Sequence, residues 1–115
     1  NLAKNVLKKL LGDTSFMDLS IDNIIKTVCN NMKVSERQIM GKTRIMEVAL
    51  ARQLAMYLSK ELTNASLSNI GSNIGGRDHS TVIHACKNIE KKIIDDPEFE
   101  KKVENIKNQL TDKNL

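Results

Sequence analysis

The sequence predicts an all-α fold, a compact bundle of about six helices that contains a helix-turn-helix. Three observations predict it. Apolar residues recur at helical spacing along most of the chain, and no stretch shows the alternation expected of a strand. Aromatic residues make up only 3% of the 115 residues, so the core consists of Leu, Ile, Val, Met and Ala, which suits helices packed on helices. This length fits one domain with one modest core.

Residues that cap a first helical turn mark where these helices begin. The predicted caps are Ser20, Ser35, Ser66, Asp78 and Asp96. The expected helices span residues 21–32, 36–40, 46–63, 67–74, 78–95 and 97 onwards. Gln38 completes a capping box with Ser35, and Val34 and Ile39 are spaced as a hydrophobic staple. Residues 41–44 then form a basic loop.

The long helix over residues 46–63 is expected to have one buried and one exposed face. Its apolar stripe consists of Val48, Ala51, Ala55, Leu58 and Leu62. A separate polar arc consists of Arg52, Gln53, Ser59, Lys60 and Thr63. We therefore expect a partly basic, solvent-facing surface on this helix.

Charge and cysteine usage narrow the class of protein. The formal net charge of +4 allows a polyanionic partner without requiring one. Cys29 and Cys86 are far apart, fall on apolar stripes, and have neither disulfide-framework nor metal-site spacing. No apolar run reaches the length of a membrane span, and no signal peptide is visible. We expect a cytoplasmic protein, and because the sequence begins at Asn1 rather than Met, we expect it to be a fragment.

The segment from residue 67 to residue 95 has the layout of a helix-turn-helix: a short helix, a Gly75-Gly76 turn and a longer helix. The longer helix has a buried side with Val82, Cys86, Ile89 and Ile93, and an opposite side with Ser80, His84, Lys87 and Lys91. At its N-terminal end lie Asp78, His79, Ser80 and Thr81. In a helix-turn-helix that end enters the major groove, and its free N–H groups favour phosphate.

Residues 75–86, GGRDHSTVIHAC, resemble the signature segment of the C-terminal domain of the DnaA family of bacterial replication initiators. Residues 52–63 resemble the helix that precedes that segment, and the resemblance extends from about Ile21 to Ile94. It implies a TrpR-like helix-turn-helix domain that binds double-stranded DNA at short repeated origin elements, supporting initiation of chromosome replication at the bacterial nucleoid. It implies no enzyme activity, no cofactor and no metal in this domain.

The resemblance also implies a role for individual residues. Base contacts would come from Arg44 in the minor groove and from Asp78, His79 and Ser80 in the major groove. Phosphate contacts would come from Lys42, Arg52, Gln53, Lys60, Thr81 and His84. The chain departs from the family pattern, because Thr43, Met46 and Leu50 stand where basic residues are common, Ala51 replaces a proline, and Ser80 stands where threonine is usual.

By the same resemblance, residues 1–19 would be a connector helix and linker from an absent ATP-binding ATPase domain, and residues 20–115 the DNA-binding domain. Lys4, Lys8 and Lys9 lie beside apolar residues in the connector. Such a basic amphipathic helix can lie on acidic membrane lipids. Packing of this helix on the ATPase domain is the favoured interpretation.

Two other functions are consistent with the sequence. One is a stand-alone helix-turn-helix regulator, and the other is a protein-interaction module with weakened DNA binding, favoured by the reduced basic loop. A nucleotide-binding loop at residues 71–78 is disfavoured, because Arg77 and Asp78 stand where such a loop needs Lys and Ser or Thr. Metal or acid–base chemistry by His79 and His84 is disfavoured, because they do not share a helix face and no carboxylate cluster accompanies them.

Overall fold

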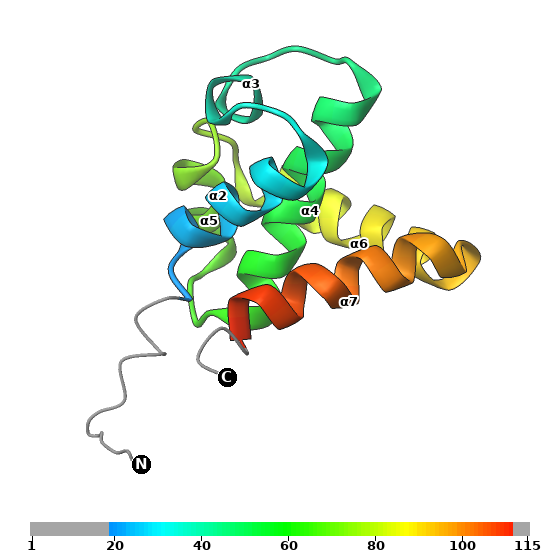
Figure 1. The fold of residues 1–115 in the computed structure, drawn as a ribbon. Helices are drawn as coiled ribbons and strands as arrows, with labels where there is room; N and C mark the ends of the chain where they lie inside the picture. The colour runs from blue at the N-terminus through cyan, green and yellow to red at the C-terminus, as the bar shows by residue number, and fades with distance from the viewer. Residues whose placement is uncertain (1–18, 112–115) are drawn as a thin grey trace.

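A computed structural model describes residues 19–111, which form six helices (Figure 1). These helices are α2 (Ile21–Met32), α3 (Glu36–Met40), α4 (Met46–Leu62), α5 (Leu67–Asn73), α6 (His79–Asp95) and α7 (Pro97–Thr111). The predicted all-helical fold is confirmed, and the predicted bounds are met to within one residue. The predicted connector helix and linker, residues 1–18, lie outside the described residues.

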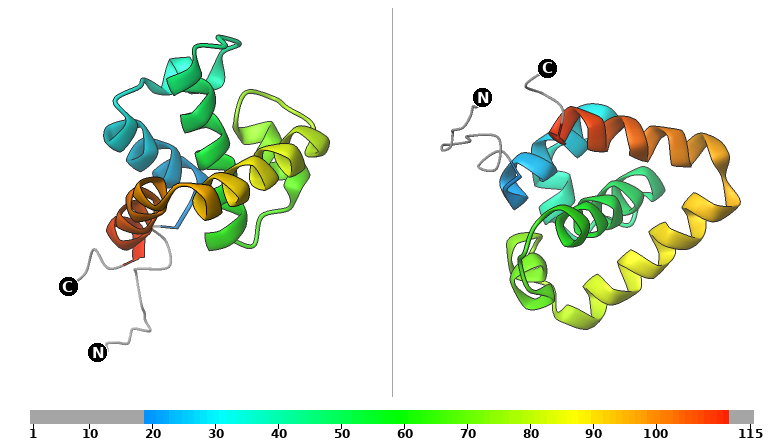
Figure 2. Two further views of the ribbon diagram at one scale, coloured as in Figure 1. Left: turned by 90° about the vertical axis from the view of Figure 1, so that its right-hand side faces the viewer. Right: turned by 90° about the horizontal axis from the view of Figure 1, so that it is seen from below.

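Helix α4 occupies the centre of the bundle. It packs against α2, α3, α5 and α6, and the right-hand view in Figure 2, seen from below, shows the other helices arranged around it. Its buried residues point in almost every direction and include Leu54, Met56 and Tyr57, which lie outside the predicted stripe. A helix that is buried nearly all round belongs in a core rather than on a surface.

This central position corrects one prediction about α4. Arg52 and Ser59 were expected on an exposed polar arc, but Arg52 is only 9% exposed and Ser59 is fully buried. Gln53 is half-buried, whereas Lys60 is exposed as predicted. The prediction was wrong because one apolar stripe describes a surface helix, whereas α4 has neighbours on several sides.

The predicted cap residues make the expected hydrogen bonds at the helix starts. The hydroxyl oxygens of Ser20, Ser35 and Ser66 accept from the backbone N–H groups three residues ahead, at 3.0–3.1 Å. The capping box is complete, because the Gln38 side chain accepts from the Ser35 N–H at 2.9 Å. These bonds satisfy N–H groups that the first turn of each helix would otherwise leave unpaired.

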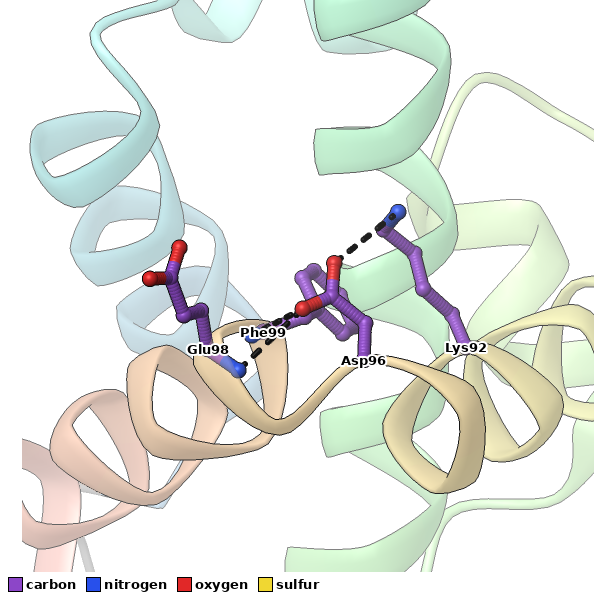
Figure 3. A network of polar contacts seen from close by, with 4 residues as sticks. All are labelled: Lys92, Asp96, Glu98 and Phe99. Carbon is purple, nitrogen blue, oxygen red and sulfur yellow. Dashed lines mark hydrogen bonds and ion pairs between the residues drawn. The ribbon is translucent and has the colours of Figure 1, made fainter.

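Asp96 fixes the joint between α6 and α7 (Figure 3). Its Oδ1 accepts from the backbone N–H of Glu98 at 3.1 Å and of Phe99 at 3.2 Å, which confirms it as a helix cap. Its Oδ2 lies 3.8 Å from Nζ of Lys92, which also lies 5.2 Å from the centre of the Phe99 ring. The last turn of α6 is thereby tied to the first turn of α7.

Both cysteines are free thiols in the core, as the apolar stripes predicted. Burial raises the pKa of the Cys29 thiol and of the Cys86 thiol. A raised pKa keeps a thiol protonated and unreactive at neutral pH, so both residues serve packing. Within residues 19–111, no helix has the length and apolar character needed to cross a membrane.

The turn between α5 and α6 requires glycine at three positions. Gly75 and Gly76 have φ angles of 80° and 66°, in the region that residues with a Cβ rarely adopt. Gly71, in α5, accepts a hydrogen bond on its carbonyl from the Arg77 N–H at 2.8 Å. A Cβ on Gly71 would lie 2.1 Å from the Arg77 carbonyl oxygen, so only glycine lets the turn come back this close to α5.

Gly71→Ala should therefore destabilise the domain by about 2–3 kcal/mol, because the added methyl group must push backbone atoms apart. Thermal or urea unfolding measures the change. Ser72→Ala, an exposed substitution in the same helix, is the matched control and should change stability by less than about 0.5 kcal/mol. Equal stability of the two variants would show that the turn is not packed against α5 in this way.

Candidate nucleic-acid interface

The first turn of α6 projects into solvent. Asp78, His79, Ser80 and Thr81 are all exposed. Oδ1 of Asp78 accepts from the backbone N–H of Thr81 at 3.1 Å and from its hydroxyl at 3.0 Å. These hydrogen bonds, the backbone one first, lower the pKa of Asp78, so its carboxylate is an ionised helix cap at neutral pH. Asp78 and Thr81 are therefore held by each other, and all four polar side chains are exposed.

A cavity of about 250 Å³ lies between α4 and α6, and we call it the notch. It is lined by Ala49, Arg52, Gln53, Met56, Arg77, Thr81, His84 and Ala85. Four predicted phosphate-contact residues, Arg52, Gln53, Thr81 and His84, are therefore brought together, although they come from two separate sequence segments. Apolar side chains also line the notch, but no carboxylate does.

Arg52 points its guanidinium into the end of α3 and the loop that follows. Its Nε donates to the Ile39 carbonyl at 2.8 Å, and its Nη1 donates to the Thr43 carbonyl at 3.2 Å. Its Nη2 donates to the carbonyls of Gln38 and Gly41, at 2.9 and 3.0 Å. Burial, and then the neighbouring charge of Arg77, lowers the pKa of Arg52. Four of its five N–H groups are thus engaged inside the protein.

Arg77 was not among the predicted contact residues, and it is the main addition that the structure makes. It lies in the turn directly before Asp78, and its side chain reaches back to the same loop. Its Nη1 donates to the Ile74 carbonyl at 2.9 Å, and its Nη2 donates to the Gly41 carbonyl. The Gly41 carbonyl therefore accepts from two guanidinium groups. The sequence signals for Arg77 were its position after the two glycines and its place in the signature segment, and neither indicates where its side chain points.

The loop between α3 and α4 is exposed. Lys42 and Arg44 have exposed side chains, as do Ile45 and Met46, and Met46 is 80% exposed. The Thr43 hydroxyl accepts from the Ile45 N–H at 3.3 Å, which bends the loop locally. Arg44 is free to reach a partner that approaches from outside.

Lys60 lies apart from the notch. It is exposed on the last turn of α4 and lines a smaller hollow together with Lys87 and Glu90 of α6. Within residues 19–111 the ion pair is Lys92–Asp96, so Lys42, Arg44, Lys60 and Arg77 form no ion pair with a carboxylate of these residues. Cations without a paired carboxylate favour an anionic partner.

The two histidines do not form a chemical centre. His79 and His84 are both exposed, and within residues 19–111 no three His, Cys, Asp or Glu side chains gather where they could hold a metal ion. His84 instead lines the notch, one turn along α6 from the capped end.

Comparison with known proteins identifies the family to which this chain belongs. A family model described as the bacterial DnaA protein helix-turn-helix matches residues 21–89, which include the notch, the glycine turn and the capped start of α6. The chain belongs to this family. The predicted resemblance and the predicted helix-turn-helix are both confirmed, and the domain is a non-catalytic DNA-binding module.

The relatives that the chain matches are named chromosomal replication initiator protein DnaA. The chain is 43% identical over 108 residues to the chromosomal replication initiator protein DnaA of Chlorobaculum tepidum, covering 94% of this chain and 22% of that protein. It is 43% identical over 110 residues to that of Flavobacterium psychrophilum, covering 96% of this chain and 23% of the relative. The protein of Treponema denticola is 37% identical, with 94% and 23% covered. The chain thus spans less than a quarter of these relatives.

Proposed function

We propose that this domain binds DnaA boxes, the short duplex elements of a bacterial replication origin, and supports initiation of chromosome replication within a longer protein. The main support is the geometry at α6: a rigidly capped, exposed first turn beside a cation-lined notch without a carboxylate. Membership of the DnaA helix-turn-helix family supports the same function.

The exposed turn fits base reading in the major groove. Asp78 offers acceptor oxygens, Ser80 offers a donor and an acceptor, and His79 offers both in its neutral form. Because Oδ1 of Asp78 is fixed by the cap of α6, the side of the carboxylate that faces solvent has a defined direction. We assign base contacts in the major groove to these three residues, and a minor-groove contact to Arg44.

Phosphate contacts are assigned to Lys42, Gln53, Lys60, Thr81 and His84. All five are exposed or half-buried, and three of them line the notch. Arg52 is kept in this set with a narrower role. With four N–H groups used on backbone carbonyls, it has one left for a phosphate at the notch.

We further propose that residues 1–19 connect the domain to an ATP-binding ATPase domain and pack on it, with acidic lipids as the alternative partner of this segment. The support is the pattern of Lys4, Lys8 and Lys9 beside apolar residues. We place the protein at the nucleoid in the bacterial cytoplasm, because its relatives are named as chromosomal replication initiator proteins.

Salt dependence tests the proposed phosphate contacts. If about four or five phosphates are neutralised, a plot of log affinity against log salt should have a slope between roughly −3 and −5. Lys60→Ala should make the slope about one unit shallower and weaken specific and random duplex alike. Lys101→Ala removes the same charge from an exposed site on α7 and should leave the slope unchanged. A slope near zero, or two variants that behave alike, would contradict the proposal.

Asp78→Asn tests base reading separately from charge. Asn caps a helix about as well as Asp, so the fold should survive. Removing a negative charge should leave binding to random duplex unchanged or tighter. Binding to the DnaA box should weaken by roughly tenfold or more, the scale of one lost base contact. Asp22→Asn, the same charge change at an exposed position of α2, is the control. Unchanged binding of Asp78→Asn to the specific duplex would remove Asp78 from the base contacts.

A further inference from the structure

Two arginines hold the basic loop to the recognition helix. The loop is residues 41–45, between α3 and α4, and it carries Lys42 and Arg44. Its Gly41 carbonyl accepts hydrogen bonds from Arg52 of α4 and from Arg77 of the helix-turn-helix turn. One peptide oxygen thus joins three segments that are distant in the sequence. We call Arg52, Arg77 and this carbonyl the joint.

The loop has little else to hold it in place. From Gly41 to Glu47 no side chain is buried, so no apolar residue anchors it in the core. Its remaining hydrogen bonds lie at its two ends and within it. The Gly41 N–H donates to the last turn of α3, the Ile45 N–H donates to Thr43, and the Ile45 carbonyl accepts from the Ala49 N–H of α4 at 2.9 Å. Arg52 also holds the Thr43 carbonyl, next to Arg44. The loop carbonyls that precede Arg44 are therefore held by the two guanidinium groups, while the Ile45 carbonyl ties the other end of the loop to α4.

Arg77 links this loop position to α6. Its own N–H is bonded to the Gly71 carbonyl, and the next residue, Asp78, caps α6. A Cβ on Gly75 would overlap the Arg77 guanidinium and lie 2.7 Å from the Met40 carbonyl, so the glycine turn leaves room for this arginine against the end of α3. A shift of the loop therefore cannot occur without moving or breaking the contact with the turn that starts α6.

We propose that Arg52 and Arg77 are positioning residues that set the distance and angle between Arg44 and the start of α6, and thereby which base pairs the two elements read together. This proposal rests on the proposed DNA-binding function and on Arg44 as the minor-groove contact. An arginine suits this role because its planar fork donates to several carbonyls at fixed angles, which a lysine ammonium does not reproduce.

A double-mutant cycle on DNA affinity tests the joint. Arg77→Lys keeps the positive charge and removes the fork. Arg44→Ala alone should weaken binding to the DnaA box roughly tenfold, with a smaller loss when the A·T pairs facing the loop are replaced by G·C, whose amino group fills the minor groove. In the Arg77→Lys background, Arg44→Ala should cost less than about threefold, because the loop no longer presents Arg44 correctly. Arg77→Lys alone should also reduce the preference for A·T over G·C pairs at these positions.

The control cycle pairs Arg77→Lys with Lys60→Ala, which lies away from the joint, and should be additive within about twofold. Additive losses for Arg77→Lys and Arg44→Ala, with the A·T preference intact, would overturn the joint and leave the proposed function standing. If Arg44→Ala alone changes neither affinity nor the A·T preference, the minor-groove assignment itself fails.

The unmodified chain provides a second test that does not depend on a variant folding. Hydrogen-bonded guanidinium groups exchange their protons slowly with water. The Nε–H signal of Arg52 and the Nη–H signals of Arg77 should therefore persist in NMR spectra of the protein, both alone and with a DnaA-box duplex. Fast exchange of both groups in both states would overturn the joint.

Discussion

The central position of α4 is the constraint on which the interface depends. Because α2, α3, α5 and α6 all pack against it, α4 brings its own residues and those of α6 to the same notch. The helices around α4 also bury the Arg52 guanidinium, which a surface helix would expose. Arg52 must then bond to protein atoms, and it donates to the Gln38 and Ile39 carbonyls at the end of α3. A charged side chain in the core thus organises the loop outside it.

The distribution of charge at the notch follows from these hydrogen bonds. Two arginines are used on backbone carbonyls, and they bring positive charge to the notch without a carboxylate to neutralise it. The carboxylate nearest in sequence, Asp78, is engaged by the first turn of α6 and keeps an ionised, directed outer edge. In the proposed interface, the arginines of the notch would attract the polyanion and the Asp78 carboxylate would discriminate between bases.

Local signals in the sequence predicted most of the fold, because caps and turns depend on neighbouring residues. Ser20, Ser35 and Asp96 cap the helices that they were predicted to cap, and Gly75-Gly76 adopts the left-handed conformation that a tight turn needs. The direction of Arg52 could not be read from one stripe, since it depends on how many helices surround α4. The apolar Leu54, Met56 and Tyr57, outside that stripe, were the signal that could have corrected it.

Other features depend on contacts between distant segments and have no local signal. The side chain of Arg77 meets a loop 36 positions earlier, which no spacing rule indicates. The gathering of Gln53, Thr81 and His84 at one notch also follows from the packing of α4 on α6. The family resemblance named most of these residues as DNA contacts, but their arrangement comes from the structure, and their roles stay predictions.

Mapping of backbone amide shifts by NMR during titration with a DnaA-box duplex tests the central claim most directly. The claim is that the loop and the start of α6 form one DNA surface. Large shifts are expected for residues 41–46 and 78–84 and around Lys60, with little change along α7. Shifts confined to α2 and α7, or a loop that does not respond while α6 does, would contradict a single surface built from the loop and the recognition helix.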